Sequence, residues 1–241
     1  MRRSVDAVVD VMKVPASGDA SLAVLPVASP AFSPVEDCEL LIAGGGTGGV
    51  AAAIAAARAG RRVVLLEETD WLGGQMTAQG VSALDEHEHI ESFGGTRSYC
   101  ELRNAIRRHY GELNPGNCWV TRLAFEPRVA VDVIEEMLPP QVSIRRRTKT
   151  VAVTTDGDRI TEVMAMGLDD GRTVRFQPAL VIDATELGDL LPLCGAEHVI
   201  GAETIAQTGE PQAQPVEPSR IACRASPTPS PASGGRAANG T

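Results

Sequence analysis

The sequence predicts an α/β protein: a parallel sheet with helices on both faces, together with a small β-meander. Three observations carry this prediction. An apolar segment at 38–43 runs into a glycine-rich turn and then into an alanine-rich, helix-forming stretch. A second apolar segment follows directly at 61–68. A third apolar segment, at 179–185, comes after alternating stretches that are separated by Asp-Gly turns.

The first of these elements form a βαβ unit. The stretch 38–43, with sequence CELLIA, is typical of a buried parallel strand. The alanine-rich run is built from strong helix formers and stops at Gly60, a residue that commonly ends helices. The segment 61–68 then supplies a second buried strand that ends in acidic residues. Strand, glycine turn, helix and strand fit within about thirty residues, as such a unit requires.

Two further helices and the meander are predicted beyond an irregular polar stretch. Apolar residues at helical spacing predict a helix over 96–110, which Gly111 ends. A second helix is predicted over 127–138, stopped by two prolines. The alternating segments between there and the strand at 179–185 predict the β-meander.

The domain organisation follows from composition. Residues 1–37 lack sustained periodicity and are predicted to be a disordered leader. Residues 211–241 are rich in Ala, Pro, Ser, Gly and Arg, a mix too poor in large apolar groups to offset the entropy of ordering. We therefore expect the folded domain at 38–210, followed by a disordered low-complexity tail.

The glycine turn has the spacing of a dinucleotide-binding motif. Gly44 permits the tight turn, Gly46 lets the backbone approach a pyrophosphate, and Gly49 lets the helix pack near the strands. The free N–H groups and the positive dipole end of the helix favour anionic phosphates. The pattern is informative here because it follows a strand and opens a helix. It predicts a Rossmann-type domain.

The acidic end of the second strand indicates a ribose rather than a 2′-phosphate. Glu67 lies 18 residues after Gly49, a spacing that suits a carboxylate accepting hydrogen bonds from an adenosine ribose. This fingerprint does not separate FAD from NAD, since both cofactors use the same unit. The pair Gly73-Gly74 favours FAD, because backbone amides there can approach the pyrophosphate and the ribityl chain of a flavin.

The stretch LLIAGGGTGGVAAAIAAARAGRRVVLLEETDWLGGQMT resembles the start of FAD-dependent oxidoreductases of the two-dinucleotide-binding, glutathione-reductase-like superfamily. Within that group the chain is most similar to a bacterial family in which a WLGGQ-type segment precedes a TRSY-type helix. The later stretch VIDATELGDLLPLCGAE is similar to the second marker of that family. The resemblance covers about residues 38–210.

The resemblance implies further contacts with FAD. The strand beginning near Thr150-Val151 would touch the adenine through its backbone, and Ala184-Thr185 would close over the dinucleotide. The expected cofactor-binding residues are Gly44, Gly46, Thr47, Gly48, Gly49, Glu67, Glu68, Gly73, Gly74, Gln75, Thr150, Val151, Ala184 and Thr185. Many relatives have glycine at the position of Glu186, so the local turn is expected to differ here.

The resemblance also implies that the chain is an incomplete fragment. Family members continue for hundreds of residues, so a substrate domain is expected to be largely missing. Lys13 and Lys149 are the only lysines, so nearly all basic residues are arginine, which suggests a GC-rich coding sequence. A frameshift near codon 210 would then explain the tail, and a native disordered tail is the alternative.

Charge and cysteine content exclude several function classes. The net charge of −9 disfavours nucleic acid as a partner, because such binding depends on basic patches that neutralise phosphates. No stretch reaches the roughly 20 apolar residues of a membrane span. The five cysteines form no CxxC pair and show no metal-ligand spacing, so we expect no metal site and a cytoplasmic location. The sequence does not predict the oligomeric state.

Other candidate residues carry less specific signals. The polar run Asp85, Glu86, His87, Glu88 and His89 could line a pocket or hold a metal, but a solvated loop is the simpler interpretation. Arg97 and Arg122 could clamp a carboxylate, although ordinary ion pairing is expected more often. Cys100, Trp71 and Trp119 are interpreted as packing residues.

We therefore expect an enzyme that transfers a hydride between a small organic substrate and bound FAD. No residue can be assigned as catalytic, because in this chemistry the cofactor carries the hydride and the protein orients it. The alternatives are an NAD-dependent enzyme of the same fold and a non-catalytic or truncated flavoprotein.

Overall fold

The computed structural model describes residues 8–10, 24–26, 33–92, 94–198 and 204–211. Residues 1–197 and 198–241 form two separate units, and each is described by itself. The predicted tail at 211–241 lies almost wholly outside the described residues. Within the predicted leader, β1 (Val8–Asp10) pairs with β2 (Val24–Pro26) in antiparallel fashion.

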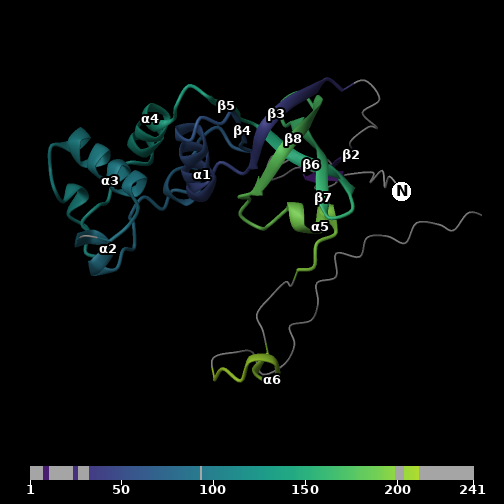
Figure 1. Ribbon diagram of the computed structural model, residues 1–241. Helices are drawn as coiled ribbons and strands as arrows, with labels where there is room; N and C mark the ends of the chain where they lie inside the picture. The colour runs from purple at the N-terminus through teal and green to yellow at the C-terminus, as the bar shows by residue number, and fades with distance from the viewer. Residues whose placement is uncertain (1–7, 11–23, 27–32, 93, 199–203, 212–241) are drawn as a thin grey trace, which may run out of the picture. The chain divides into compact units, whose positions relative to one another are not determined.

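A six-stranded mixed sheet forms the centre of the first unit (Figure 1). Its strands are β3 (Val35–Ala43), β4 (Val63–Leu66), β5 (Val142–Arg145), β6 (Thr148–Asp156), β7 (Arg159–Gly167) and β8 (Thr173–Asp183). Their order in the sheet is β5-β4-β3-β8-β7-β6. The first four are parallel, whereas β7 and β6 continue the sheet in antiparallel pairing. The α/β class is therefore confirmed.

Three helices gather on one side of the sheet (Figure 1). They are α1 (Thr47–Arg58), α3 (Arg97–Tyr110) and α4 (Pro127–Met137), close to the predicted ranges. The Thr96 side chain accepts from the Tyr99 amide at the start of α3, and Gly111 ends that helix with a φ of +69°. The remaining short helices of this unit are η2 (Gly74–Met76), α2 (Glu88–Ser92), η3 (Pro115–Asn117) and α5 (Leu190–Cys194). The second unit contributes α6 (Ile205–Thr208).

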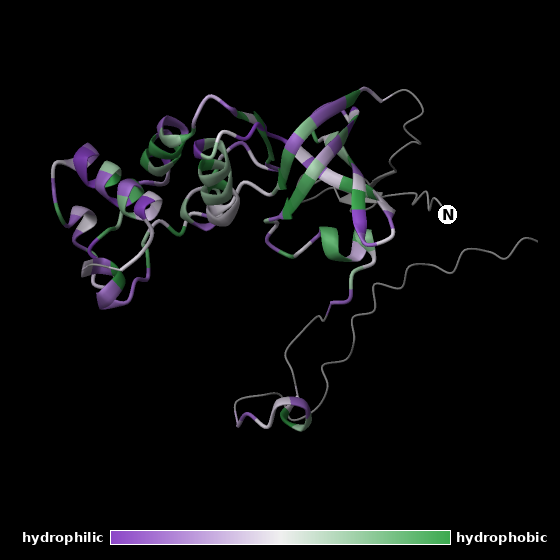
Figure 2. Ribbon diagram, viewed as in Figure 1, coloured by the Kyte–Doolittle hydropathy of each residue, from purple (hydrophilic) through white to green (hydrophobic). Residues whose placement is uncertain are grey.

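Alternate residues of the central strands pack on opposite faces. Leu40 and Ile42 of β3 contact the helices, whereas Leu41 packs with Phe176 of β8 on the other face. This alternation follows from the two-residue repeat of a strand. Figure 2 shows the long apolar stretches of β3 and β8 that result. The short helix α5 packs on this second face through Leu193 and Cys194.

The predicted β-meander is part of the main sheet and not a separate structure. One long strand, β8, completes the meander with β7 and also pairs with β3 over its length. The sheet curls enough that the Thr148 amide at the start of β6 donates to the Glu67 carbonyl at 2.9 Å. The start of β6 therefore lies beside the end of β4, although three strands separate them in the sheet.

The glycine turn between β3 and α1 requires two of its glycines. Gly44 has a φ of +97°, and a Cβ there would lie 2.3 Å from the Ala184 carbonyl oxygen. A Cβ on Gly49 would lie 1.9 Å from the Gly44 carbonyl oxygen. Gly49 thus allows α1 to pack close to the turn, as the motif predicts. A Cβ on Gly48 would meet nothing within 4 Å.

We predict that Gly44→Ala lowers the free energy of unfolding by more than about 2 kcal/mol, because it combines backbone strain with a steric clash. Gly48→Ala is the matched control on the same turn. It should leave stability unchanged or raise it by up to about 1 kcal/mol, since alanine favours a helix more than glycine does. Urea unfolding monitored by circular dichroism measures both. Equal stabilities of the two variants would contradict this account of the turn.

Candidate functional site

A cleft of about 80 Å³ lies at the carboxyl ends of β3, β4 and β8. Ligands of open α/β sheets bind at this edge, where neighbouring loops diverge. Of the expected cofactor-binding residues, those that line the cleft are Gly44, Gly46, Glu67, Glu68, Gly74, Thr150, Ala184 and Thr185. Those that do not line it are Thr47, Gly48, Gly49, Gly73, Gln75 and Val151.

The two glycine segments, far apart in the chain, meet at this cleft. The Gly73 amide donates to the Gly45 carbonyl at 2.8 Å, and the Thr47 hydroxyl donates to the Gly73 carbonyl at 3.3 Å. A Cβ on Gly74 would lie 3.0 Å from the Gly46 Cα. The two backbones can approach this closely only because side chains are absent from both. They form a narrow wall of buried and half-buried backbone in front of the first turn of α1.

Glu67 lies at the end of β4 and is 7% exposed. One carboxylate oxygen accepts from the Gly45 amide at 2.9 Å, and the other accepts from the Thr69 amide at 2.7 Å. Each oxygen of an ionised carboxylate can accept a second hydrogen bond. Glu67 can therefore hold the glycine turn in place and still accept hydrogen bonds from the hydroxyl groups of a ribose in the cleft.

The start of β6 provides the opposite wall. The Thr150 hydroxyl is buried and has no hydrogen-bond partner among the described residues. Lys149 forms ion pairs with Glu68 at 3.0 Å and with Asp189 at 3.5 Å. Burial alone would lower the pKa of Lys149, but hydrogen bonds and charges from Glu68 and Asp189 outweigh it and raise that pKa. Lys149 therefore stays positively charged beside the cleft.

Asp183 shapes the turn that follows β8. One carboxylate oxygen accepts from the Thr185 amide at 3.0 Å and from the Thr185 hydroxyl at 2.7 Å. The other accepts from the Leu190 amide at 3.0 Å. These bonds bring the Ala184 carbonyl against Gly44, the contact that excludes a side chain there. Asp183 thus positions Ala184 and Thr185 beside the glycine turn.

Glu186 is exposed and reaches across the cleft. Its Oε1 lies 3.1 Å from the position of a Cβ on Gly46 and 2.9 Å from that of a Cβ on Gly74. The carboxylate therefore sits between the two glycine segments, at the amino end of α1. Negative charge is favoured at a helix N-terminus, so this is where a phosphate would also bind.

The residues of the cleft fit an adenine dinucleotide, although the space between them is small. Three features of the cleft suit this ligand. They are the wall formed by the two glycine segments, the Glu67 oxygens, which can each accept one more hydrogen bond, and the Thr150 hydroxyl, which has no hydrogen-bond partner among the described residues. Sites for drug-sized ligands measure roughly 300–1,000 Å³, so the cleft must open to admit a dinucleotide. Glu186 is the side chain that narrows it between the glycine segments.

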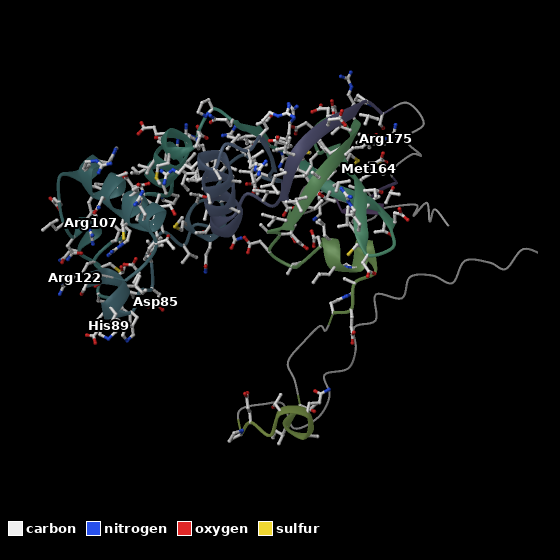
Figure 3. The ribbon with its side chains drawn as sticks, viewed as in Figure 1. Asp85, His89, Arg107, Arg122, Met164 and Arg175 are labelled. Atoms are coloured by element: carbon white, nitrogen blue, oxygen red, sulfur yellow. The ribbon has the colours of Figure 1, made fainter. Side chains whose placement is uncertain are left out.

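The polar run at 85–89 does not line this cleft. Glu86 is buried and pairs with Arg103 at 3.0 Å. His87, Glu88 and His89 are exposed, and their candidate ligand atoms lie within 4.8 Å of one another. Figure 3 shows His89 on α2 and Asp85 near that helix. No ion is present to test the expectation that the chain holds no metal.

The two candidate arginines also lie elsewhere. Arg122 is exposed, with its guanidinium 3.9 Å from Glu91, and Arg97 is exposed on α3. Neither lines the cleft. Ordinary ion pairing therefore describes Arg122 better than a carboxylate clamp does.

Sequence analysis missed several residues that line the cleft, namely Gly45, Thr148, Lys149, Glu186 and Asp189. Gly45 belongs to the recognised motif and could have been included. Thr148 and Lys149 begin β6, and the curl of the sheet brings them to the glycine turn. Glu186 and Asp189 follow β8, and the pairing of β8 with β3 brings them there. Among the described residues, no helix has the length and apolarity needed to cross a membrane.

Comparisons with solved structures find several flavoproteins. L-proline dehydrogenase from P. horikoshii is 20% identical with a TM-score of 0.39, over 63% of this chain and 23% of that one. A flavoprotein/dehydrogenase from Cytophaga hutchinsonii is 17% identical with a TM-score of 0.48, over 70% and 44%. The p-nitrophenol 4-monooxygenase from Pseudomonas putida is 19% identical with a TM-score of 0.45, over 70% and 46%. This chain thus spans less than half of each structure.

No curated protein matches the sequence. The model of a family described as "FAD dependent oxidoreductase" matches residues 39–233, a range that includes the glycine turn, α5 and all of the six-stranded sheet except the first four residues of β3. The match continues beyond Glu210, where the resemblance was expected to end. The chain therefore belongs to the FAD-dependent oxidoreductase family, and its cofactor is FAD.

Proposed function

We propose that this protein transfers a hydride between a small organic substrate and FAD bound in the cleft at the ends of β3, β4 and β8. The observation that carries the proposal is the meeting of three groups in one place: the two glycine segments, the Glu67 carboxylate and the Thr150 hydroxyl. They come from separate parts of the chain, and each suits a different part of a flavin dinucleotide.

Different residues would bind different parts of the cofactor. The amides of the first turn of α1 and the backbone of Gly46 would hold the pyrophosphate. Glu67 would accept hydrogen bonds from the adenosine ribose, and Thr150 would offer its hydroxyl to the adenosine end. Gly73 and Gly74 would lie along the ribityl chain. FAD supplies the hydride acceptor or donor when bound, and these residues bind and orient it.

We also propose a cytoplasmic location and a small-molecule partner. The location is supported by the cysteines, because Cys38, Cys100, Cys118 and Cys194 are free thiols. Burial, together with the charges of Glu36 and Asp37, raises the pKa of Cys38 to about 11. That thiol therefore stays protonated and unreactive at neutral pH.

The purified 241-residue chain should bind FAD non-covalently. After incubation with FAD and removal of excess, acid precipitation should release FAD into the supernatant, where its absorbance is measured. NAD at the same concentration is the control and should leave the melting temperature unchanged. A rise of the melting temperature with NAD, with no FAD released, would overturn the assignment of this cleft. Reduction of bound FAD by a substrate tests the oxidoreductase step.

Glu67→Ala should weaken FAD binding by about 1–3 kcal/mol, because hydrogen bonds from hydroxyls to a charged carboxylate are lost. The matched control is Glu136→Ala, which removes an exposed carboxylate of α4 that does not line the cleft. It should change the affinity by less than about 1 kcal/mol. Isothermal titration with FAD, on variants shown to be folded by circular dichroism, compares the two. Equal affinities of both variants would refute the role of Glu67 at the ribose.

Glu186→Gln should tighten FAD binding by about twofold to fivefold at low salt. The Glu186 carboxylate lies at the amino end of α1, where its interaction with the helix dipole contributes about 0.3–1 kcal/mol. A phosphate that binds at the same place must displace the carboxylate, and that interaction is then lost. The difference between variant and wild type should shrink at high ionic strength, because salt screens exposed charges. Titrations at two salt concentrations measure it. Weaker binding by the variant would show that Glu186 contacts FAD favourably.

A further inference from the structure

A second cavity, of about 470 Å³, is lined by α1, α3 and α4 together with residues of the stretches 85–90 and 95–96. It shares no lining residue with the FAD cleft. Its volume falls in the range of small-molecule sites, roughly 300–1,000 Å³. Of the residues expected to bind FAD, Thr47 alone lines this cavity.

The wall of the cavity is apolar where the helices form it. Val50 and Ile54 line it from α1, Leu102 from α3, and Ile134 and Met137 from α4. Such a surface favours a hydrophobic body, because burial of apolar area is the main source of affinity there. The cavity thus suits an apolar molecule over most of its extent.

One end of the cavity is lined by polar side chains, and a carboxylate oxygen there has no hydrogen-bond partner among the described residues. Glu86 lines it, and the side chain of Glu86 is only 4% exposed. One of its oxygens pairs with Arg103 at 3.0 Å and accepts from the Tyr99 hydroxyl. The other oxygen, Oε2, is buried and has no hydrogen-bond partner among the described residues. A buried charged acceptor left unpaired costs free energy, so this oxygen favours a donor.

The surrounding groups select the kind of donor. Tyr99 also lines the cavity, and burial together with the hydrogen bond to Glu86 raises its pKa, so its hydroxyl stays protonated and directed to Glu86. Asp85 adds a second carboxylate to the lining, whereas no lysine or arginine lines the cavity. An anionic ligand head would therefore meet like charges, and a hydroxyl or ammonium head would meet acceptors.

We propose that this cavity is a separate binding site for a small molecule with an apolar body and a head that donates hydrogen bonds, an ammonium group or a hydroxyl. The apolar walls hold the body, and the head lies at the polar end, beside the carboxylates of Asp85 and Glu86. Thr47 is the one expected FAD-binding residue in this lining and the FAD cleft itself shares none of it, so the proposal does not depend on the proposed function.

Three probes with the same carbon skeleton and different heads test the proposal: phenethylamine, phenethyl alcohol and phenylacetate. In isothermal titrations of the full chain, the amine or the alcohol should bind at least about tenfold more tightly than phenylacetate, as expected for a hydrogen bond to a charged group. Preference for the amine identifies a charged head, and preference for the alcohol a neutral one. Equal binding of phenylacetate, or no binding of any probe, overturns the proposal.

A pair of exposed alanines on α1 locates the binding. Ala51 lines the cavity, whereas Ala55, one turn further along the helix, does not. Ala51→Leu should weaken the preferred probe by about tenfold, because it fills part of the cavity, and Ala55→Leu should leave its affinity unchanged. Equal affinities of the two variants place binding elsewhere and refute this site.

Glu86→Gln tests recognition of the head. It should reduce the preference over phenylacetate to less than about twofold, whereas a retained tenfold preference contradicts the role of Glu86. Loss of a charge from a buried pair can unfold a protein, so circular dichroism checks the variant, and the alanine pair decides if it does not fold. Titration with saturating FAD present completes the test: unchanged probe affinity supports a separate site, and displacement by FAD overturns it.

Discussion

The site depends first on the buried carboxylate of Glu67 at the end of β4. A buried charge must be hydrogen-bonded, and Glu67 meets this need with the amides of Gly45 and Thr69. Those two bonds fix the glycine turn relative to the strand. The Glu67 carbonyl also accepts from Thr148, which places the start of β6 against the same strand end. One residue therefore joins the turn and the curled edge of the sheet.

The second constraint comes from β8, which belongs to both halves of the sheet. Its parallel pairing with β3 brings Ala184 to within contact of Gly44, and its antiparallel pairing with β7 leads to β6. The curl that returns β6 to β4 follows from this arrangement, together with packing of Phe176 against the face of β3. A three-stranded extension thus becomes one wall of the cleft.

Local sequence patterns predicted the parts of this site that are local. The glycine turn, Glu67 and the helices at 97–110 and 127–137 all depend on neighbours within a few turns or on one βαβ unit. Lys149, Glu186 and Asp189 could not be found in this way, because their position depends on a strand that pairs across the sheet. The same non-local pairing joins the meander to the parallel strands, which the local pattern did not predict.

The acidic residues of the cleft show that charge alone does not decide what a site binds. Glu67 is engaged by two backbone amides, so its negative charge is already balanced and its remaining lone pairs suit neutral hydroxyls. Glu68 and Asp189 are balanced by Lys149. Glu186 differs because its carboxylate lies between the two glycine segments at the helix N-terminus, the position that a phosphate needs. Glu67 and Glu186 would therefore have opposite effects on a dinucleotide, and the groups that each carboxylate already contacts decide which.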